Sequence, residues 1–223
     1  DCTRLLELAD ELAKLGLGIE AFGGSAIAVR ETPVKPWEDD CPLHGLNPSG
    51  MPPVLKVGDL VLCESAAILG WVDDQTEGKL LFTRDDAERA ETRRLTGWFE
   101  RKFTDEVQAV LLHERMEKPL LRLGPPEARA LRAGREALKG HLAELEGLTQ
   151  GRDWLAGRRL GQADLVAAAH LSVLDYFGEI TWATYPALKD WYVRMKCRPC
   201  FRSLLADRLP GQPPVAHYDD LDF

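Results

Sequence analysis

The hydrophobic pattern of the chain changes near residue 80, and this change restricts the folds open to it. Before that point, apolar residues form short runs separated by glycine and proline, which is typical of strands and turns. After it, apolar residues recur three and four positions apart over long stretches, which is typical of amphipathic helices. Because 223 residues suffice for one or two domains, we predict a small α/β part followed by a larger all-helical part.

Composition and charge exclude several classes of protein. Hydrophobic residues make up 45% of the chain, which is ordinary for a globular protein. The net charge of −8 disfavours nucleic acid, because neutralising phosphates requires clustered positive charge. No run approaches the roughly 20 apolar residues of a membrane helix, so we expect no membrane partner. The five cysteines are an odd number in a chain that needs no covalent cross-links, which favours reduced thiols and a cytoplasmic protein.

Turn residues divide the first part of the chain into short elements. We expect a loop over the proline-rich residues 33–53 and a polar connector over about 74–84. The elements predicted before the connector are a helix over 3–15, a hairpin of 19–22 with 26–30, a second hairpin of 54–57 with 60–62, and a helix that begins at Glu64 and Ser65. The helices predicted after it cover residues 85–115, 127–148, 162–177, 186–197 and 199–207, with a break at 119–126.

Four motifs in this order resemble the glutathione S-transferase family: LNPSGMPPVL at 46–55, ESAAIL at 64–69, WLAG at 154–157 and Ala163-Asp164. The resemblance covers about residues 34–223. It implies an α/β plus all-α fold, in which a thioredoxin-like N-terminal domain, complete or truncated, precedes an all-helical C-terminal domain. The resulting division is a thioredoxin-like remnant over 34–74, the helical domain over 85–208 and a proline-rich, acidic and aromatic tail over 209–223.

Other stretches narrow the resemblance to a bacterial branch of this family that binds the division tubulin FtsZ. They are residues 88–95, 167–176, 198–207 and 217–223. This resemblance implies a non-catalytic cytoplasmic homodimer that binds FtsZ and supports cell division. Residues 1–33 instead resemble a piece of the C-terminal region of the MutL mismatch-repair family, so a fusion product is an alternative. A glutathione-dependent transferase acting on small electrophiles is another.

The resemblance also implies a glutathione pocket formed by Pro52, Pro53, Glu64 and Ser65. Pro53 matches the family's cis-proline, and Pro52 stands where the family offers the ligand an N–H and a carbonyl. Because proline has no N–H, one ligand hydrogen bond is lost, and affinity should fall several-fold. Ser65 and the first N–H groups of its helix suit a carboxylate, although a plain helix cap is an equal alternative.

No residue is predicted to be catalytic. The family's activating Ser, Tyr or Cys is not visible, and Cys2 and Thr3 have no strand before them to direct them. Asp164 matches a structural aspartate of the family whose capping partner is here Gly161, so half of that capping box is missing. We expect no metal, and no cofactor beyond weakly bound glutathione. The pair Cys197 and Cys200 is more readily explained as two incidental thiols than as a redox pair.

The tail combines carboxylates with large apolar side chains. Apolar and aromatic anchors dominate protein interfaces, so we predict that this segment docks, either on a partner or on the chain itself. In the resembled FtsZ-binding branch, the corresponding region is implicated in partner binding. The predicted partner-binding residues are Tyr218, Asp219, Asp220, Leu221, Asp222 and Phe223.

Overall fold

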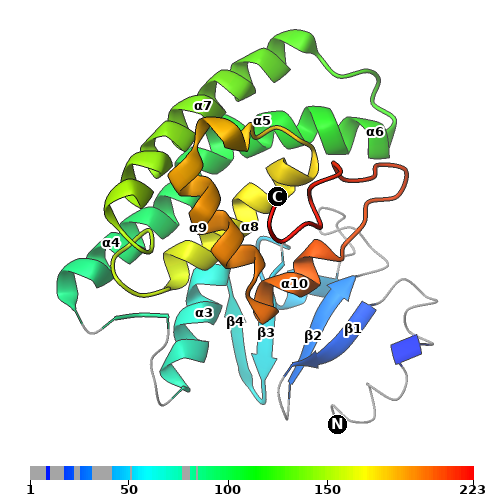
Figure 1. The fold of residues 1–223 in the computed structure, drawn as a ribbon. Helices are drawn as coiled ribbons and strands as arrows, with labels where there is room; N and C mark the ends of the chain where they lie inside the picture. Colours follow the sequence, from blue (N-terminus) through cyan, green and yellow to red (C-terminus); the bar gives the residue numbers. More distant parts are fainter. Residues whose placement is uncertain are drawn as a thin grey trace. The chain divides into compact units, whose positions relative to one another are not determined.

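The computed structural model describes residues 9–10, 18–22, 26–31, 42–50, 52–76, 81–83 and 85–223. It divides the chain into two compact units, Asp1–Glu77 and Gly78–Phe223 (Figure 1). Of the helix predicted over 3–15, only Ala9 and Asp10 are described, and both are helical. Cys2 and Thr3 lie outside the described residues, and so do residues 33–41 of the loop predicted over 33–53.

The first unit contains both predicted hairpins. Strands β1 (Gly18–Phe22) and β2 (Ala26–Glu31) pair antiparallel, and so do β3 (Val54–Val57) and β4 (Leu60–Cys63). Gly58 adopts φ 60° in the two-residue turn between β3 and β4, a conformation that glycine tolerates without strain. The remaining described elements of the unit are the 3₁₀ turn η1 (Pro42–Gly45) and helix α3 (Ser65–Asp74).

The second unit begins with a nearly continuous helix from Asp86 to Leu121, of which only part is α-helical. Residues Trp98–Gln108 form a π-helix, in which the Ala109 N–H bonds to the Thr104 carbonyl five residues earlier. The buried face repeats every four residues, at Phe99, Phe103, Val107 and Leu111, and all four are fully buried. The segments in order are α4 (Asp86–Gly97), η2 (Trp98–Gln108), α5 (Ala109–Leu112), η3 (His113–Glu117) and α6 (Lys118–Leu121).

The break predicted at Pro119 is wrong, because the helix continues to Leu121. Pro119 follows the π-helical turn η3, at a junction where the backbone hydrogen-bonding pattern changes and a missing N–H is tolerated. The helix ends instead at Arg122, which adopts the left-handed conformation with φ 55°.

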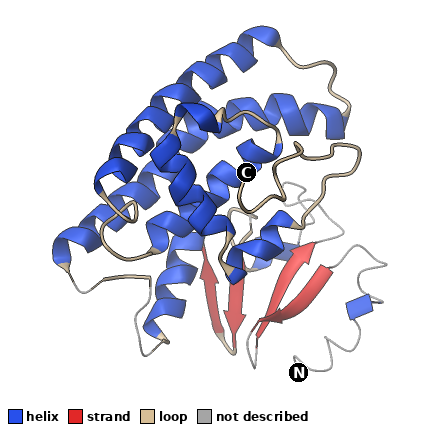
Figure 2. Ribbon diagram, in the orientation of Figure 1, coloured by secondary structure: helices blue, strands red, loops and turns tan. Residues whose placement is uncertain are grey.

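The other predicted helices are present, with ends that differ by a few residues. Helix α8 is buried on nearly all sides, as its apolar run predicts, and α7 packs against α9 (Figure 2). No helix in the described part of the chain is long and apolar enough to cross a membrane. These elements are α7 (Ala128–Gly151), α8 (Gln162–Tyr176), the 3₁₀ turn η4 (Trp182–Thr184), α9 (Pro186–Lys196) and α10 (Pro199–Leu205).

Candidate functional site

The β3–β4 hairpin brings the residues of the predicted glutathione pocket together. Val54 pairs with Cys63, so Pro53, just before β3, and Glu64, just after β4, lie at the same end of the hairpin. The Pro52–Pro53 peptide bond is cis, as the family resemblance implies. The hairpin therefore places the bend at Pro53 beside the start of helix α3.

The start of helix α3 is not capped by the side chain of its N-cap residue. Its N-cap residue is Glu64, whose exposed side chain makes no capping hydrogen bond, and Ser65 is the first helical residue. The two interpretations of Ser65, a plain cap and a carboxylate site, both stay predictions. Glu64 has φ 71° and ψ 132°, a conformation that non-glycine residues rarely adopt and that is concentrated at functional sites. A helix N-terminus of this kind attracts a carboxylate.

The loop before the cis-proline is held in one shape by contacts that were not predicted from the sequence. Buried Asn47 accepts hydrogen bonds from the Ser49 N–H at its side chain, at 3.1 Å, and from the Gly50 N–H at its carbonyl, at 2.8 Å. Gly50 has φ 66° and faces the His44 ring, which a Cβ atom would meet at 2.3 Å. The Cys63 thiol contacts the Leu46 carbonyl at 3.4 Å. The run Asn-Pro-Ser-Gly was the signal for such a turn.

The pocket has fewer donors for a peptide ligand than the family's arrangement. Pro52 precedes the bend and offers a carbonyl but no N–H. Pro52 and Pro53 are both exposed. The residues present can therefore hold a carboxylate at the start of α3, with only part of the backbone pairing that a glutathione backbone requires. Whether glutathione binds remains a prediction.

Asp164 acts as a structural centre of the second unit. Its fully buried carboxylate accepts hydrogen bonds from the N–H groups of Leu155 and Gly161, each at 2.9 Å, and from Trp191 Nε1 at 2.8 Å. Burial raises the pKa of Asp164, although the three donors act to lower it. The bond to Gly161 is the half of the capping box that a glycine N-cap permits. The contact with Trp191, 27 residues away, could not be predicted from the sequence.

The tail docks on helices of its own unit. Tyr218 is only 3% exposed and shares a 2.8 Å hydrogen bond with Ser172, as expected of a residue that docks on its own chain. The Phe223 ring packs against Trp182 and Tyr192. Of the predicted carboxylates, Asp220 and Asp222 are exposed and Asp219 pairs with Arg208. The remaining predicted residue, Leu221, is half-buried. The self-docking interpretation is therefore observed, and partner binding by these residues stays a prediction.

The described cysteines form no disulfide. Cys63, Cys197 and Cys200 are free thiols. Cys197 and Cys200 are exposed at the junction of α9 and α10. Within the described residues, no group of three or more His, Cys, Asp or Glu side chains could hold a metal ion.

Comparison with known proteins identifies the family. Residues 111–199 match the model of the glutathione S-transferase C-terminal domain. FtsZ-localized protein A of Caulobacter vibrioides is 55% identical over 207 residues, which are 91% of each chain. Among solved structures, FzlA from C. crescentus is 57% identical with a TM-score of 0.80, over 85% of this chain and 86% of that one. A glutathione S-transferase from Sinorhizobium meliloti is 41% identical with a TM-score of 0.78 and the same coverage.

A second, shorter similarity is to a DNA mismatch-repair protein. A stretch of 46 residues is 61% identical to MutL of Rhizobium leguminosarum. It makes up 21% of this chain and 7% of MutL. The similarity to FtsZ-localized protein A, by contrast, extends over most of both chains. The chain belongs to the glutathione S-transferase superfamily, in the family of FtsZ-localized protein A.

Proposed function

We propose that this chain is a non-catalytic glutathione-transferase-like protein that binds FtsZ in the cytoplasm as a homodimer and supports bacterial cell division. The observation that carries the proposal is the 55% identity to FtsZ-localized protein A over 91% of both chains. The missing N–H at Pro52 agrees with it, because a pocket that no longer has to bind glutathione can lose a ligand hydrogen bond. The exposed carboxylates of the tail offer a charged surface to a partner.

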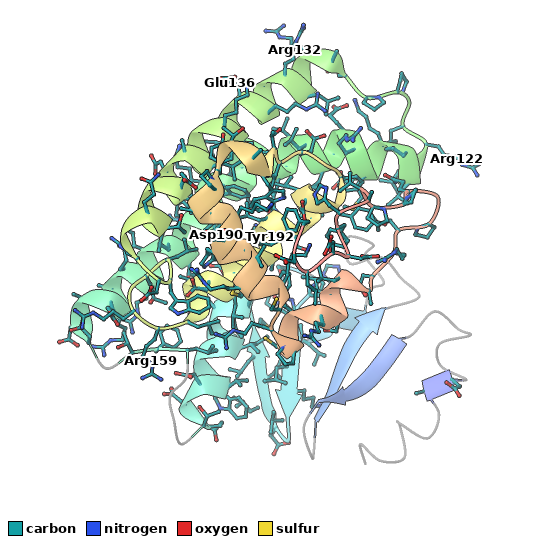
Figure 3. The ribbon with its side chains drawn as sticks, viewed as in Figure 1. Arg122, Arg132, Glu136, Arg159, Asp190 and Tyr192 are labelled. Atoms are coloured by element: carbon teal, nitrogen blue, oxygen red, sulfur yellow. The ribbon has the colours of Figure 1, made fainter. Side chains whose placement is uncertain are left out.

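Co-sedimentation tests the proposal. The chain should pellet with polymerised FtsZ and stay in the supernatant with unpolymerised FtsZ. Neutralising two exposed tail carboxylates, Asp220→Asn with Asp222→Asn, should lower the pelleted fraction by about three- to tenfold, because charges at an interface rim contribute modestly to association. A matched control neutralises two exposed aspartates elsewhere in the second unit, Asp105 and Asp190, the latter labelled in Figure 3. Equal pelleting with polymerised and unpolymerised FtsZ would refute the proposal.

The geometry of the first unit favours glutathione conjugation as a second candidate function. The cis Pro52–Pro53 bond and the start of α3 beside it, at Glu64 and Ser65, are the two features that suit the tripeptide. If glutathione binds, Pro52→Ala should raise its affinity by about two- to tenfold by restoring an N–H. Ser65→Ala should lower both affinity and conjugation of a generic electrophile. Titration calorimetry measures the binding, and an unchanged affinity in both variants would exclude this pocket.

A further inference from the structure

The last residues of the chain, Gln212–Phe223, form a segment that we call the strap (Figure 1, red). The strap lies against the last turns of helix α8. The Val215 N–H bonds to the Tyr176 carbonyl at 3.1 Å, and the Tyr176 hydroxyl bonds to the Gln212 carbonyl at 2.6 Å. Further along, His217 contacts the buried Asp175 carboxylate at 2.8 Å. All three bonds join the strap to α8, so one displacement of the strap would break them together.

The seat under the strap combines aromatic rings with a buried charge. Lys196 is fully buried, and its ammonium donates to the carbonyls of His217, at 3.2 Å, and Asp220. It also lies 4.2 Å from the centre of the Phe223 ring. Among the described residues, no carboxylate lies within ion-pair distance of this ammonium. The hydrogen-bond acceptors that the structure gives it therefore both belong to the strap.

Burying the Lys196 ammonium under the strap reduces the free-energy difference that favours the docked strap over the released one. A buried charge loses its hydration, and an apolar side chain of similar volume is often as stable or more stable at such a site. Burial accordingly lowers the pKa of Lys196. When the strap lifts, Lys196 regains water, and so does the Asp175 carboxylate under His217. Rehydration of the Lys196 ammonium thus offsets part of the aromatic contact with Trp182 and Tyr192 that is lost on release.

The link to the strap allows this movement. Residues 206–211 contain Pro210 and Gly211, and Gly211 has φ 72°. The only regular pairing described there is the bridge between Leu209 and Gln212.

Docking also changes which side chains of the strap are exposed to a partner. In the docked state, the strap shows the carboxylates of Asp220 and Asp222, while Tyr218 is covered and Phe223 packs against Trp182 and Tyr192.

We propose that Gln212–Phe223 is a releasable strap seated on Asp175, Tyr192 and Lys196, and that its release presents Tyr218 and Phe223, together with its carboxylates, to a protein partner. The identity of that partner as FtsZ rests on the proposed function. The release itself does not, and the experiments below separate the two.

Hydrogen exchange tests the release. The bonded amides of Val215 and Tyr218 should exchange at least about 100-fold faster than the amide of the fully buried Leu171 in α8, because local opening requires less free energy than global unfolding. Their exchange should also be insensitive to low concentrations of denaturant. If these amides exchange at the rate of Leu171 and with the same denaturant dependence, the strap is a permanent part of the core and the proposal is overturned.

A reversible lock tests the link to the partner. The Leu221 carbonyl lies 4.0 Å from the Cys197 thiol, so Leu221→Cys in a Cys200→Ser background places a second thiol beside Cys197. Oxidation by glutathione disulfide should slow exchange of the strap amides at least about tenfold and lower co-sedimentation with polymerised FtsZ, and reduction should restore both. The same protein with Cys197→Ser should not respond to oxidation.

The outcomes distinguish the two proposals. If the wild-type chain fails to pellet with FtsZ, the proposed function falls, while the exchange rates still decide whether the strap opens. If the wild-type chain pellets and the oxidised lock pellets equally well, release is not needed for the partner, and that part of the inference is overturned.

Discussion

Replacing Asp164 by alanine should lower the free energy of unfolding of the second unit by about 3–5 kcal/mol. The carboxylate is fully buried and serves three donors, the N–H groups of Leu155 and Gly161 and the indole N–H of Trp191. Each buried donor left without a partner destabilises a protein by about 1–3 kcal/mol. The three donors come from the loop before α8 and from α9, so the change loosens the contact between these elements.

Denaturant unfolding followed by tryptophan fluorescence measures this loss. Asp164→Asn should have a smaller effect, because the amide oxygen can still accept two of the bonds while its NH₂ group meets one N–H. The exposed Asp190 in α9 provides the matched control, and Asp190→Ala should change stability by no more than about 0.5 kcal/mol. A loss below about 1 kcal/mol for Asp164→Ala would show that these hydrogen bonds contribute little.

The sequence was informative about Asp164 only as far as local structure reaches. Its position three residues after Gly161 indicated a helix start and one of the three hydrogen bonds. The partner Trp191 lies in another helix, and a single sequence contains no signal for that pairing. The same limit applies to the hairpins. The turn at Gly58 predicted both strands, and the family resemblance implied that Pro53 and Glu64 share a pocket. The packing of His44 against Gly50 came only from the structure.

The π-helix shows a second limit of prediction from sequence. Phe99, Phe103, Val107 and Leu111 predict a helix with one buried face, and that face is present. Residues three and four apart lie on one face of an α-helix, so this spacing did not distinguish the two helix types. The difference lies in the backbone hydrogen bonds, which side-chain patterns do not report.

The tail shows that one pattern can serve two kinds of contact. Aromatic side chains beside carboxylates are suited to a partner interface, and in this structure Tyr218 and Phe223 use the same properties to bind their own unit. The surface on which the tail docks was not recognisable in the sequence. Lys196 stands in the last turn of an amphipathic helix, where lysine is ordinarily exposed and interacts favourably with the helix dipole.

Acidification should destabilise the second unit first through His170. Burial between η2 and α8 lowers the pKa of His170 to about 4, from an ordinary value of 6.5. The ring lies 5.5 Å from Phe99 and 5.8 Å from Phe103, and its Nδ1 bonds to Gln108 at 2.5 Å. Because the unfolded chain binds a proton at a higher pH than the folded chain, stability falls as the pH decreases from 6.5 to 4 and is unaffected above 6.5.

The pKa shift of His170 sets an upper limit on the free energy of unfolding that is lost on acidification. One pKa unit corresponds to about 1.4 kcal/mol, so His170 accounts for a loss of at most about 3 kcal/mol over that pH range.

Glu91 affects stability over a separate, lower pH range. Hydrogen bonds from Arg94 and then Arg152 lower its pKa to about 2, so the stability that it contributes is lost only as the pH falls from 4.5 towards 2.

Urea unfolding at pH 7 and at pH 4.5 tests the assignment to His170. The loss between these two pH values should shrink by at least half in His170→Asn, whose side chain does not titrate. The matched control is His113→Gln, which replaces a partly exposed ring that pairs with Glu117. A direct NMR titration of the His170 ring should give a pKa well below 6.5. A value near 6.5, or an undiminished loss in His170→Asn, would place the acid sensitivity in another group.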